Sequence, residues 1–345
     1  MAELSVEPFA LRLHRPLRSA WGELTERSLL RVRVDFGGED YGEGEAAPLE
    51  PYDGVPLAAV LAALDAYAEV VARFGPEDDA AALLEACRAE RALPQALAAI
   101  DLALWDRAGR RAGRPVAGLL GGDPAEPVTV NALVGAEDRA GAARAAGEAA
   151  AAGFACVKVK VGIGDDAGRL AAVRAAVGPD VVIRVDANGA WKTPEQALAN
   201  LRALAPVGLE LCEEPVHGVQ ALREVRAESA VPVAMDETAA EPGAAGSGAA
   251  DAVCLKISRC GGISGVLRDA AAARAAGSAV YLASTFDGPL GIAAALHAAA
   301  ALRATGELLP CGLATLDAFE GVAAPVVRDG ALAPPDGPGL GSWAP

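Results

Sequence analysis

Lysine is scarce in this chain, and the positions of the lysines indicate where acid/base chemistry takes place. Lysine and arginine together number 30, and the lysines are Lys158, Lys160, Lys192 and Lys256. Arginine keeps its proton near pH 7, whereas burial or a neighbouring cation lowers the pKa of lysine until its amine accepts a proton. All but Lys192 end apolar runs, in ACVKVKVG and DAVCLKIS. This pattern predicts lysine acid/base chemistry at strand ends.

Carboxylates end three further apolar runs, which lie between the lysine runs. The runs are VDAN, LCEEP and VAMDE, and the acids are Asp186, Glu213 and Asp236. Carboxylates that converge repel one another unless they are protonated or bind a cation. Each acid could instead cap a helix or pair with an arginine, but three in register between flanking lysines favour a cation site. Hard oxygen ligands select Mg²⁺ or Mn²⁺ over zinc.

The lysines differ in their expected roles. Lys158 and Lys160 are separated by one residue, so both face the same side of a strand. Repulsion between like charges lowers the pKa of an ammonium towards that of a general base. We expect Lys160 to be the base and Lys158 a charge partner. Lys256 is expected on the opposite side, and Lys192, in GAWKTPEQ, in an exposed loop.

A regular alternation of elements brings these residues together. Most of the apolar runs from VTVNALV to AVYLAS are followed by an Ala-rich amphipathic stretch, which implies a parallel sheet with right-handed crossovers. Seven runs, with an eighth around Leu308–Leu313, suffice for a (β/α)8 barrel. An open doubly wound sheet is the alternative, but no GxGxxG follows the first strand. In a barrel, one rim collects the residues at the run ends: Lys160, Asp186, Glu213, Asp236, Lys256 and Ser284.

Three regions are expected along the chain. Residues 1–123 form an α+β domain, with strands in FALRLH and LLRVRVDF and helices over about Val55–Phe74 and Leu93–Ala112. Residues 124–320 form the barrel. The last region, residues 321–345, is rich in proline and glycine and is expected to return to the first domain.

The composition narrows the classes of partner. A formal net charge of −16 argues against nucleic acid or an anionic membrane as the main partner. The six cysteines include no CxxC pair, and the chain does not open with a charged, then apolar, then small-residue sequence. We therefore expect free thiols and a cytoplasmic protein. Charged residues interrupt the Ala-rich runs, so no membrane span is expected. A homo-oligomer is compatible with this composition.

Several segments together resemble the enolase superfamily and its muconate-lactonizing subgroup. AAIDLALWDRAGRRAGRPVAGLLGG resembles the end of the family's capping domain, and KVKV resembles its lysine strand. DAN, EEP and MDE resemble the three metal-ligand strands. LKISRCGG and STFDGPLGIAAALH resemble the sixth and seventh strands. The resemblance implies the modified TIM barrel of this superfamily behind an N-terminal α+β capping domain.

The resemblance also implies roles for individual residues. Asp186, Glu213 and Asp236 correspond to Mg²⁺ ligands, and Glu213 is favoured over Glu214 because the first glutamate of EEP is the ligand. Lys160 and Lys256 correspond to the base and the opposing lysine. The implied substrate is a small-molecule carboxylate that loses a proton next to its carboxyl group. The turns around residues 16–27 and 48–53 are expected to cover the site and to set specificity.

Within the subgroup, three segments resemble the o-succinylbenzoate synthases, which are dehydratases of menaquinone synthesis. They are RVDAN, PCGLATLDAF and STFDGPLG. This resemblance implies that the substrate contacts Lys158, Arg184, Asn188 and Ser284. The alternative is an isomerase that uses the same lysines: an N-succinylamino-acid racemase, a dipeptide epimerase or a muconate-type cycloisomerase. A barrel that only binds its ligand is a third interpretation, but it would not require the lysines.

Overall fold

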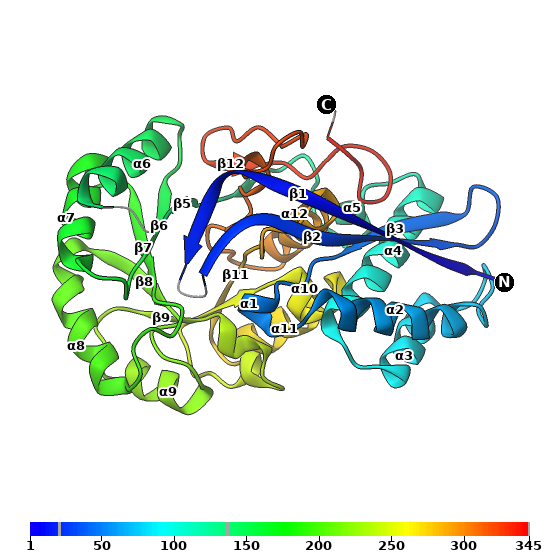
Figure 1. Cartoon of the computed structure of the whole chain (residues 1–345), viewed down its shortest axis with the longest axis horizontal. Helices are drawn as coiled ribbons and strands as arrows, with labels where there is room; N and C mark the ends of the chain where they lie inside the picture. Colours follow the sequence, from blue (N-terminus) through cyan, green and yellow to red (C-terminus); the bar gives the residue numbers. More distant parts are fainter. Residues whose placement is uncertain (20–21, 136–137, 344–345) are drawn as a thin grey trace.

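An antiparallel sheet and a group of helices form the first part of the molecule. The computed structural model describes residues 1–19, 22–135 and 138–343. Within these ranges, three strands pair in the order β1–β2–β3, with bounds Glu3–Ser19, Gly22–Asp35 and Tyr41–Ala46. They are followed by α1 (Glu50–Asp53), α2 (Leu57–Val71), α3 (Ala80–Glu90), α4 (Pro94–Ala112) and α5 (Val116–Leu119). Figure 1 shows this part in blue and cyan beside the barrel.

Helix α4 meets strand β3 at backbone distance, which fixes the core of the first part. A Cβ atom at Gly44 would lie 2.1 Å from the Ala99 oxygen, and one at Gly42 would lie 1.9 Å from the Ala103 oxygen. Only glycine allows this approach. The helix begins at a proline, which suits a first turn, and ends before Gly113, whose φ of 62° is left-handed.

Parallel strands form the second part, as the alternation of elements predicts. Seven of them pair within the described ranges in the order β5–β6–β7–β8–β9–β10–β11. Their bounds are Ala132–Val134, Cys156–Lys160, Val182–Asp186, Leu209–Glu213, Val233–Met235, Ala252–Leu255 and Ala279–Leu282. The pairings between neighbours are parallel. The expected barrel fold is therefore confirmed.

The eighth position of the barrel differs from the expected strand. Instead of a continuous ladder, Cys311 makes an isolated parallel bridge to Val130, and Gly312 makes one to Ala283. Pro310 directly precedes these residues and has no N–H to donate to a ladder. Val130 lies just before β5, and Ala283 directly follows β11. Cys311 and Gly312 therefore lie between the first and last strands of the sheet and connect them around the barrel.

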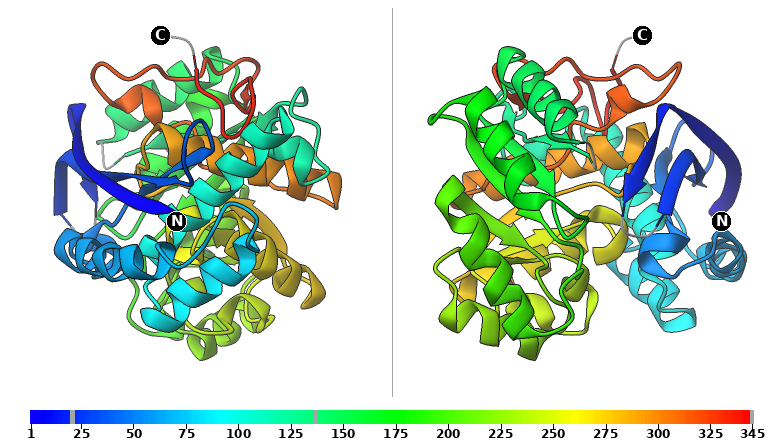
Figure 2. Two further views of the ribbon diagram at one scale, coloured as in Figure 1. Left: turned by 90° about the vertical axis from the view of Figure 1, so that its right-hand side faces the viewer. Right: turned by 60° about the vertical axis from the view of Figure 1, so that its left-hand side comes forward.

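Helices cover the outside of the barrel strands. They are α6 (Arg139–Ala151), α7 (Asp166–Val177), α8 (Pro194–Leu204), α9 (Val219–Glu228), α10 (Ile257–Cys260), α11 (Ile263–Ala275) and α12 (Pro289–Ala304). Short 3-10 turns cover Ala205–Val207, Glu237–Ala240, Ala244–Gly246 and Leu316–Ala318. In Figures 1 and 2 the green helices form an arc around the strands. Small residues allow α12 to be buried on almost every side, against α5, α11 and β3.

The last segment of the chain runs back over both parts. Strand β12 (Ala331–Leu332) pairs with β4 (Val128–Thr129) in antiparallel fashion. Further on, the Leu340 N–H donates to Asp106 Oδ1 at 2.8 Å, and Gly339 hydrogen-bonds the connection between α4 and α5. The region boundaries expected at residues 123 and 320 stay predictions.

The remaining features of the fold are its cysteines and the lengths of its helices. The six cysteines are free, and all but Cys260 are buried. A buried thiol in an apolar run packs as a small hydrophobic side chain. Within the described ranges, no helix is both long and apolar enough to cross a membrane.

Candidate active site

The predicted residues occupy matching positions on consecutive strands. In the parallel ladder Lys160 pairs with Asp186, and Asp186 pairs with Glu213. Matching positions point to the same side of a sheet because side chains alternate along a strand. Asp236 directly follows β9, and Lys256 directly follows β10. The strands therefore bring these side chains to their shared carboxyl-terminal rim.

A cavity lies at this rim, between the barrel and the first domain. The predicted site residues that line it are Lys158, Lys160, Asp186, Asn188, Asp236, Lys256 and Ser284. An apolar wall is formed by Leu17, Leu49, Phe286 and Ala314. Leu17 belongs to one of the two turns expected to cover the site, and Leu49 to the other. Ala20 and Trp21 of the first turn lie outside the described residues.

Lys158 lies among the carboxylates as their cation. Its Nζ is 2.5 Å from Glu213 Oε1 and 2.9 Å from Asp186 Oδ2. Burial disfavours the charged amine, but the two carboxylates outweigh this effect and raise the pKa of Lys158. These contacts favour the protonated form of Lys158, and its role as a charge partner stays a prediction.

Lys160 faces the cavity from β6. Its Nζ donates to Asp186 Oδ2 and to Asn188 Oδ1, each at 2.6 Å, and its side chain is 18% exposed. Asn188 has a φ of 44°, a left-handed conformation that asparagine tolerates better than most residues. The Asn188 amide also donates to Glu237 Oε1 at 2.9 Å. The Asn188 side chain is thus held from both ends and orients the Lys160 amine.

Lys256 approaches from β10 and is more enclosed. Its side chain is 6% exposed, and its ammonium donates to the Asp236 carboxylate. Burial disfavours the charge, but Asp236 outweighs it and raises the pKa of Lys256. Tyr52 of α1 covers this pair, with its ring centroid 5.2 Å from the ammonium and its hydroxyl donating to Asp236 Oδ1 at 3.0 Å. The first domain therefore closes the Lys256 side of the site.

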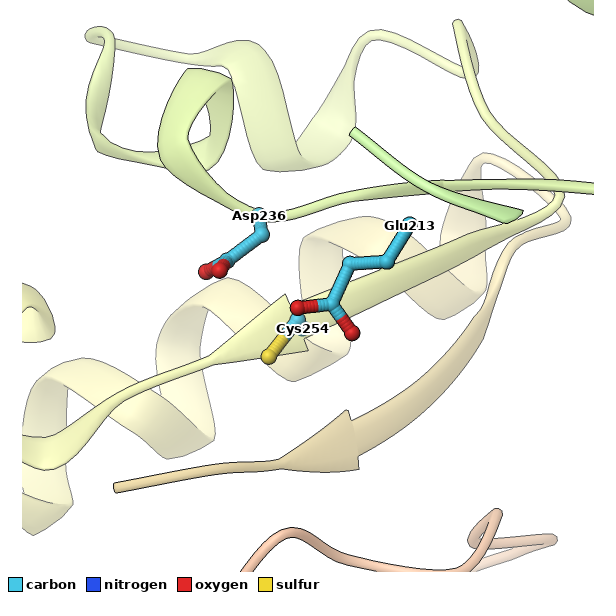
Figure 3. Close-up of side chains that lie close together, drawn as sticks. All are labelled: Glu213, Asp236 and Cys254. Carbon is cyan, nitrogen blue, oxygen red and sulfur yellow. The ribbon is translucent and has the colours of Figure 1, made fainter. Parts of the chain in front are cut away.

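The three predicted metal ligands are almost completely buried. Burial raises the pKa of Glu213. Burial also opposes the charged forms of Asp186 and Asp236, but the lysines outweigh it and lower the pKa of both, that of Asp236 to about 2. Glu213, Asp236 and Cys254 each place a ligand atom within 4.8 Å of the others, and Figure 3 shows the three side chains together. Asp186 is joined to Glu213 through the Lys158 ammonium.

This donor set fits a hard divalent cation. Buried carboxylates need compensating charge, and an ammonium lies between two of them here. Carboxylate oxygens are the ligands that Mg²⁺ prefers, whereas a thiol is a soft ligand. Burial raises the pKa of Cys254 well above its usual value, so this thiol stays protonated near neutral pH. The oxygens of Asp186, Glu213 and Asp236 would therefore hold Mg²⁺, and Cys254 would pack beside it.

Glu213 and Glu214 differ in what their oxygens contact, which bears on the choice between them. The Glu214 carboxylate accepts backbone N–H bonds from Asp236 at 2.7 Å and from Thr238 at 3.0 Å. It also contacts His217 Nδ1 at 2.9 Å. These bonds commit Glu214 to holding the turn after β9, and Glu213 is the glutamate that faces Lys158.

Arg184 is the one expected substrate contact that the structure does not bring to the cavity. It is 1% exposed and is not among the described residues that line the cavity. Its guanidinium donates to the Pro310 oxygen at 2.6 Å and pairs with Glu210. Arg184 has the same strand face as Asp186 but lies deeper in the barrel. We therefore propose a structural role for Arg184.

The structure adds residues that the sequence did not single out. Tyr281 of β11 donates its hydroxyl to Glu213 Oε2 at 2.6 Å, and Thr315 hydrogen-bonds Ser284 at 2.9 Å. A tyrosine inside the apolar run AVYLAS was the available signal for the first. Tyr52 lies in a turn that was expected to cover the site, but no sequence pattern pairs it with Asp236.

A capped barrel with lysines and buried carboxylates on one rim defines a class of barrel enzymes that move protons beside a metal ion. Residues 1–121 match the mandelate racemase / muconate lactonizing enzyme N-terminal domain. Residues 141–342 match the enolase C-terminal domain-like family. The chain belongs to the enolase superfamily, in its muconate-lactonizing subgroup, as the sequence motifs predicted. Members of this superfamily bind Mg²⁺ through acidic residues.

Relatives with different activities resemble the chain to a similar degree. An o-succinylbenzoate synthase of Thermobifida fusca is 38% identical over 201 residues, which cover 55% of this chain and 60% of the relative. An N-succinyl-L-Arg/Lys racemase of Bacillus cereus is 32% identical over 220 residues, 60% of this chain and 58% of the relative. The solved dipeptide epimerase of Enterococcus faecalis with Mg and L-Leu-L-Tyr has a TM-score of 0.88, 27% identity and 99% coverage of both chains. The chain is therefore an enzyme of a family that includes a synthase, a racemase and an epimerase.

Proposed function

We propose that this protein is an o-succinylbenzoate synthase. It would convert 2-succinyl-6-hydroxy-2,4-cyclohexadiene-1-carboxylate into 2-succinylbenzoate and water, a step of menaquinone synthesis. Asp186, Glu213 and Asp236 hold the metal ion in this proposal, Lys160 is the base, and Lys256 is a fixed cation. The observation that carries the proposal is the difference between the two lysines. Both lysines pair with a carboxylate, but Lys160 is 18% exposed at the cavity, whereas Lys256 is 6% exposed and is covered by the Tyr52 ring.

One lysine that faces the cavity and one enclosed lysine suit a dehydration on a single face. The neutral amine of Lys160 removes the proton from the ring carbon that bears the carboxylate. The hydroxyl group on the neighbouring carbon leaves, takes a proton from the Lys160 ammonium and departs as water, while the ring gains a double bond. Lys256 supplies positive charge from the other side. Mg²⁺, when bound, stabilises the negative charge that develops on the substrate carboxylate.

Two further observations support this choice over a dipeptide epimerase. The T. fusca synthase is 38% identical in sequence over the 201 aligned residues. Among the described residues that line the cavity, Asp186 and Asp236 are the acidic side chains, and both belong to the proposed metal site. No further carboxylate in this lining is left to pair with a substrate ammonium. The wall of Leu17, Leu49 and Phe286 suits a ring instead.

An N-succinylamino-acid racemase is the second candidate. The B. cereus relative favours it, and so does the presence of lysines on two sides of the cavity. Racemisation requires Lys256 to give and take a proton as well as Lys160. A cycloisomerase would also use both lysines.

Parallel rate measurements on the candidate substrates test the proposal. The purified protein with Mg²⁺ would receive the cyclohexadiene carboxylate, a set of N-succinylamino acids and a set of dipeptides. We expect the highest kcat/KM for the cyclohexadiene carboxylate, followed as loss of diene absorbance. A higher kcat/KM for an N-succinylamino acid or a dipeptide, measured by polarimetry, would overturn the synthase assignment. EDTA is expected to abolish each activity.

A further inference from the structure

Tyr281 is a buried tyrosine whose hydroxyl faces a proposed metal ligand. It lies in β11, is 1% exposed, and donates to Glu213 Oε2 at 2.6 Å. The other oxygen, Glu213 Oε1, lies 2.5 Å from the Lys158 ammonium. The two oxygens of this carboxylate therefore have different partners.

Arg184, which lies deep in the barrel, packs against the Tyr281 ring. The Arg184 guanidinium lies 5.0 Å from the centroid of the ring. Arg184 is itself fixed by its bond to the Pro310 oxygen at 2.6 Å and by its ion pair with Glu210. The ring is thus contacted by Arg184, and its hydroxyl is contacted by Glu213. A buried tyrosine hydroxyl needs a hydrogen-bond partner, and Glu213 is the one it contacts here.

We propose that Tyr281 is a positioning residue for the metal ion: it orients the Glu213 carboxylate, and Arg184 holds Tyr281. The proposal rests on the proposed role of Glu213 as a ligand. Hydrogen bonds to the outer atoms of a ligand restrict its orientation, and their loss typically weakens metal binding about 10- to 100-fold. Arg184, which the sequence suggested as a substrate contact, then acts two steps away from the ion.

Packing alone would give a different outcome, so the two explanations can be separated. If Tyr281 only fills the barrel, removal of its hydroxyl changes stability and leaves the affinity for Mg²⁺ as it is. If it orients Glu213, the affinity falls, because the carboxylate then samples orientations that do not suit the ion. Tyr281→Phe keeps the ring and its contact with Arg184 and removes only the hydroxyl.

Tyr67→Phe is the matched control. Tyr67 is also completely buried, and its hydroxyl also donates a hydrogen bond, but to the backbone oxygen of Arg91 in the first domain. This variant loses a buried tyrosine hydroxyl without touching the proposed metal site. Any general effect of such a loss on the fold therefore appears in both variants.

The experiment is a calorimetric titration of the metal-free full-length protein with MgCl₂ alone. Tyr281→Phe is expected to raise the Kd for Mg²⁺ about 10- to 100-fold, and Tyr67→Phe to leave it within about twofold. At saturating Mg²⁺ the kcat of Tyr281→Phe should return towards that of the unaltered protein, which a purely structural defect would not do. An unchanged Kd in Tyr281→Phe would overturn the proposal.

A third variant separates this proposal from the proposed reaction. Glu213→Gln should weaken Mg²⁺ binding at least as much as Tyr281→Phe. If Glu213→Gln binds Mg²⁺ as tightly as the unaltered protein, both the ligand role of Glu213 and the positioning role of Tyr281 are overturned. The titration contains no substrate, so it does not depend on which reaction the enzyme catalyses. If the synthase assay shows no turnover but Tyr281→Phe still raises the Kd for Mg²⁺, the proposed reaction is refuted and the positioning role of Tyr281 is not.

Discussion

The burial of His297 leads us to predict that the protein loses stability as the pH falls. The side chain lies in α12, is fully buried, and connects three parts of the chain. Its Nδ1 accepts the Ala117 N–H at 3.2 Å, and its Nε2 donates to the Leu340 oxygen at 3.1 Å. This pattern requires the neutral imidazole, because Nδ1 serves as an acceptor. Burial lowers the pKa of His297 to about 4.

The size of this effect follows from the difference between the pKa of His297 in the folded protein and its pKa in the unfolded chain. In an unfolded chain the pKa of histidine is about 6.5. As the pH falls below 6.5, the unfolded chain binds a proton that the folded protein does not bind until about pH 4. The contribution of His297 to stability is therefore fully present above pH 6.5 and is lost as the pH falls towards 4. The loss is about 3 kcal/mol in the free energy of unfolding.

Urea unfolding between pH 4.5 and 7.5 in EDTA measures this loss. His297→Gln keeps a donor and an acceptor but does not titrate, so its free energy of unfolding should fall less steeply below pH 6.5 than that of the unaltered protein. His14→Gln, which alters an exposed histidine, controls for removal of an imidazole. Parallel pH profiles for His297→Gln and the unaltered protein would refute the reasoning.

Two other changes test the contacts between the domains and the packing within the first domain. Arg27 donates to the backbone oxygens of Ala47, Pro48, Thr285 and Phe286. Arg27→Met leaves these oxygens without this donor and should lower the free energy of unfolding by roughly 2–5 kcal/mol. An unchanged melting temperature would contradict this prediction. Gly44→Ala should destabilise by at least about 1–3 kcal/mol because its Cβ would meet the Ala99 oxygen at 2.1 Å. The control Gly147→Ala, in α6 with open space around its Cβ, should stabilise by about 0.5–1 kcal/mol, and equal effects in the two glycine variants would contradict the packing argument.

Periodicity accounts for what the sequence predicted about the site. Lys160, Asp186 and Glu213 could be placed together because each ends an apolar run and parallel strands share a rim. Arg184 shows the limit of the same argument. The alternation of a strand tells which face a side chain takes but not how deep in the barrel it lies, and Arg184 is two residues below Asp186. Depth is set by neighbouring strands, which a single sequence does not reveal.

The features that were predicted poorly or not at all have different causes. Helix α3 was not expected, although Asp79 accepts the Ala81 N–H at 2.9 Å as its N-cap. The run around Leu308–Leu313 was expected to be a strand because its residues are apolar, but Cys311 and Gly312, next to Pro310, make isolated bridges instead of a ladder. Tyr281 contacts Glu213 from a position 68 residues further along the chain. Contacts of this kind depend on how the barrel closes.

One rate measurement tests the central claim, that Lys160 moves the proton of a carboxylate substrate beside a metal ion. The loss of diene absorbance from the cyclohexadiene carboxylate would be followed with Mg²⁺ in the unaltered protein, in Lys160→Ala and in the control Lys192→Ala. Lys192 is an exposed lysine outside the cavity lining. We predict that Lys160→Ala loses at least about 10³-fold in kcat, since general acid/base catalysis contributes about 10²–10⁴-fold and Lys160 acts in both steps. Lys192→Ala should stay within about twofold, and a Lys160→Ala variant as active as Lys192→Ala would contradict the account.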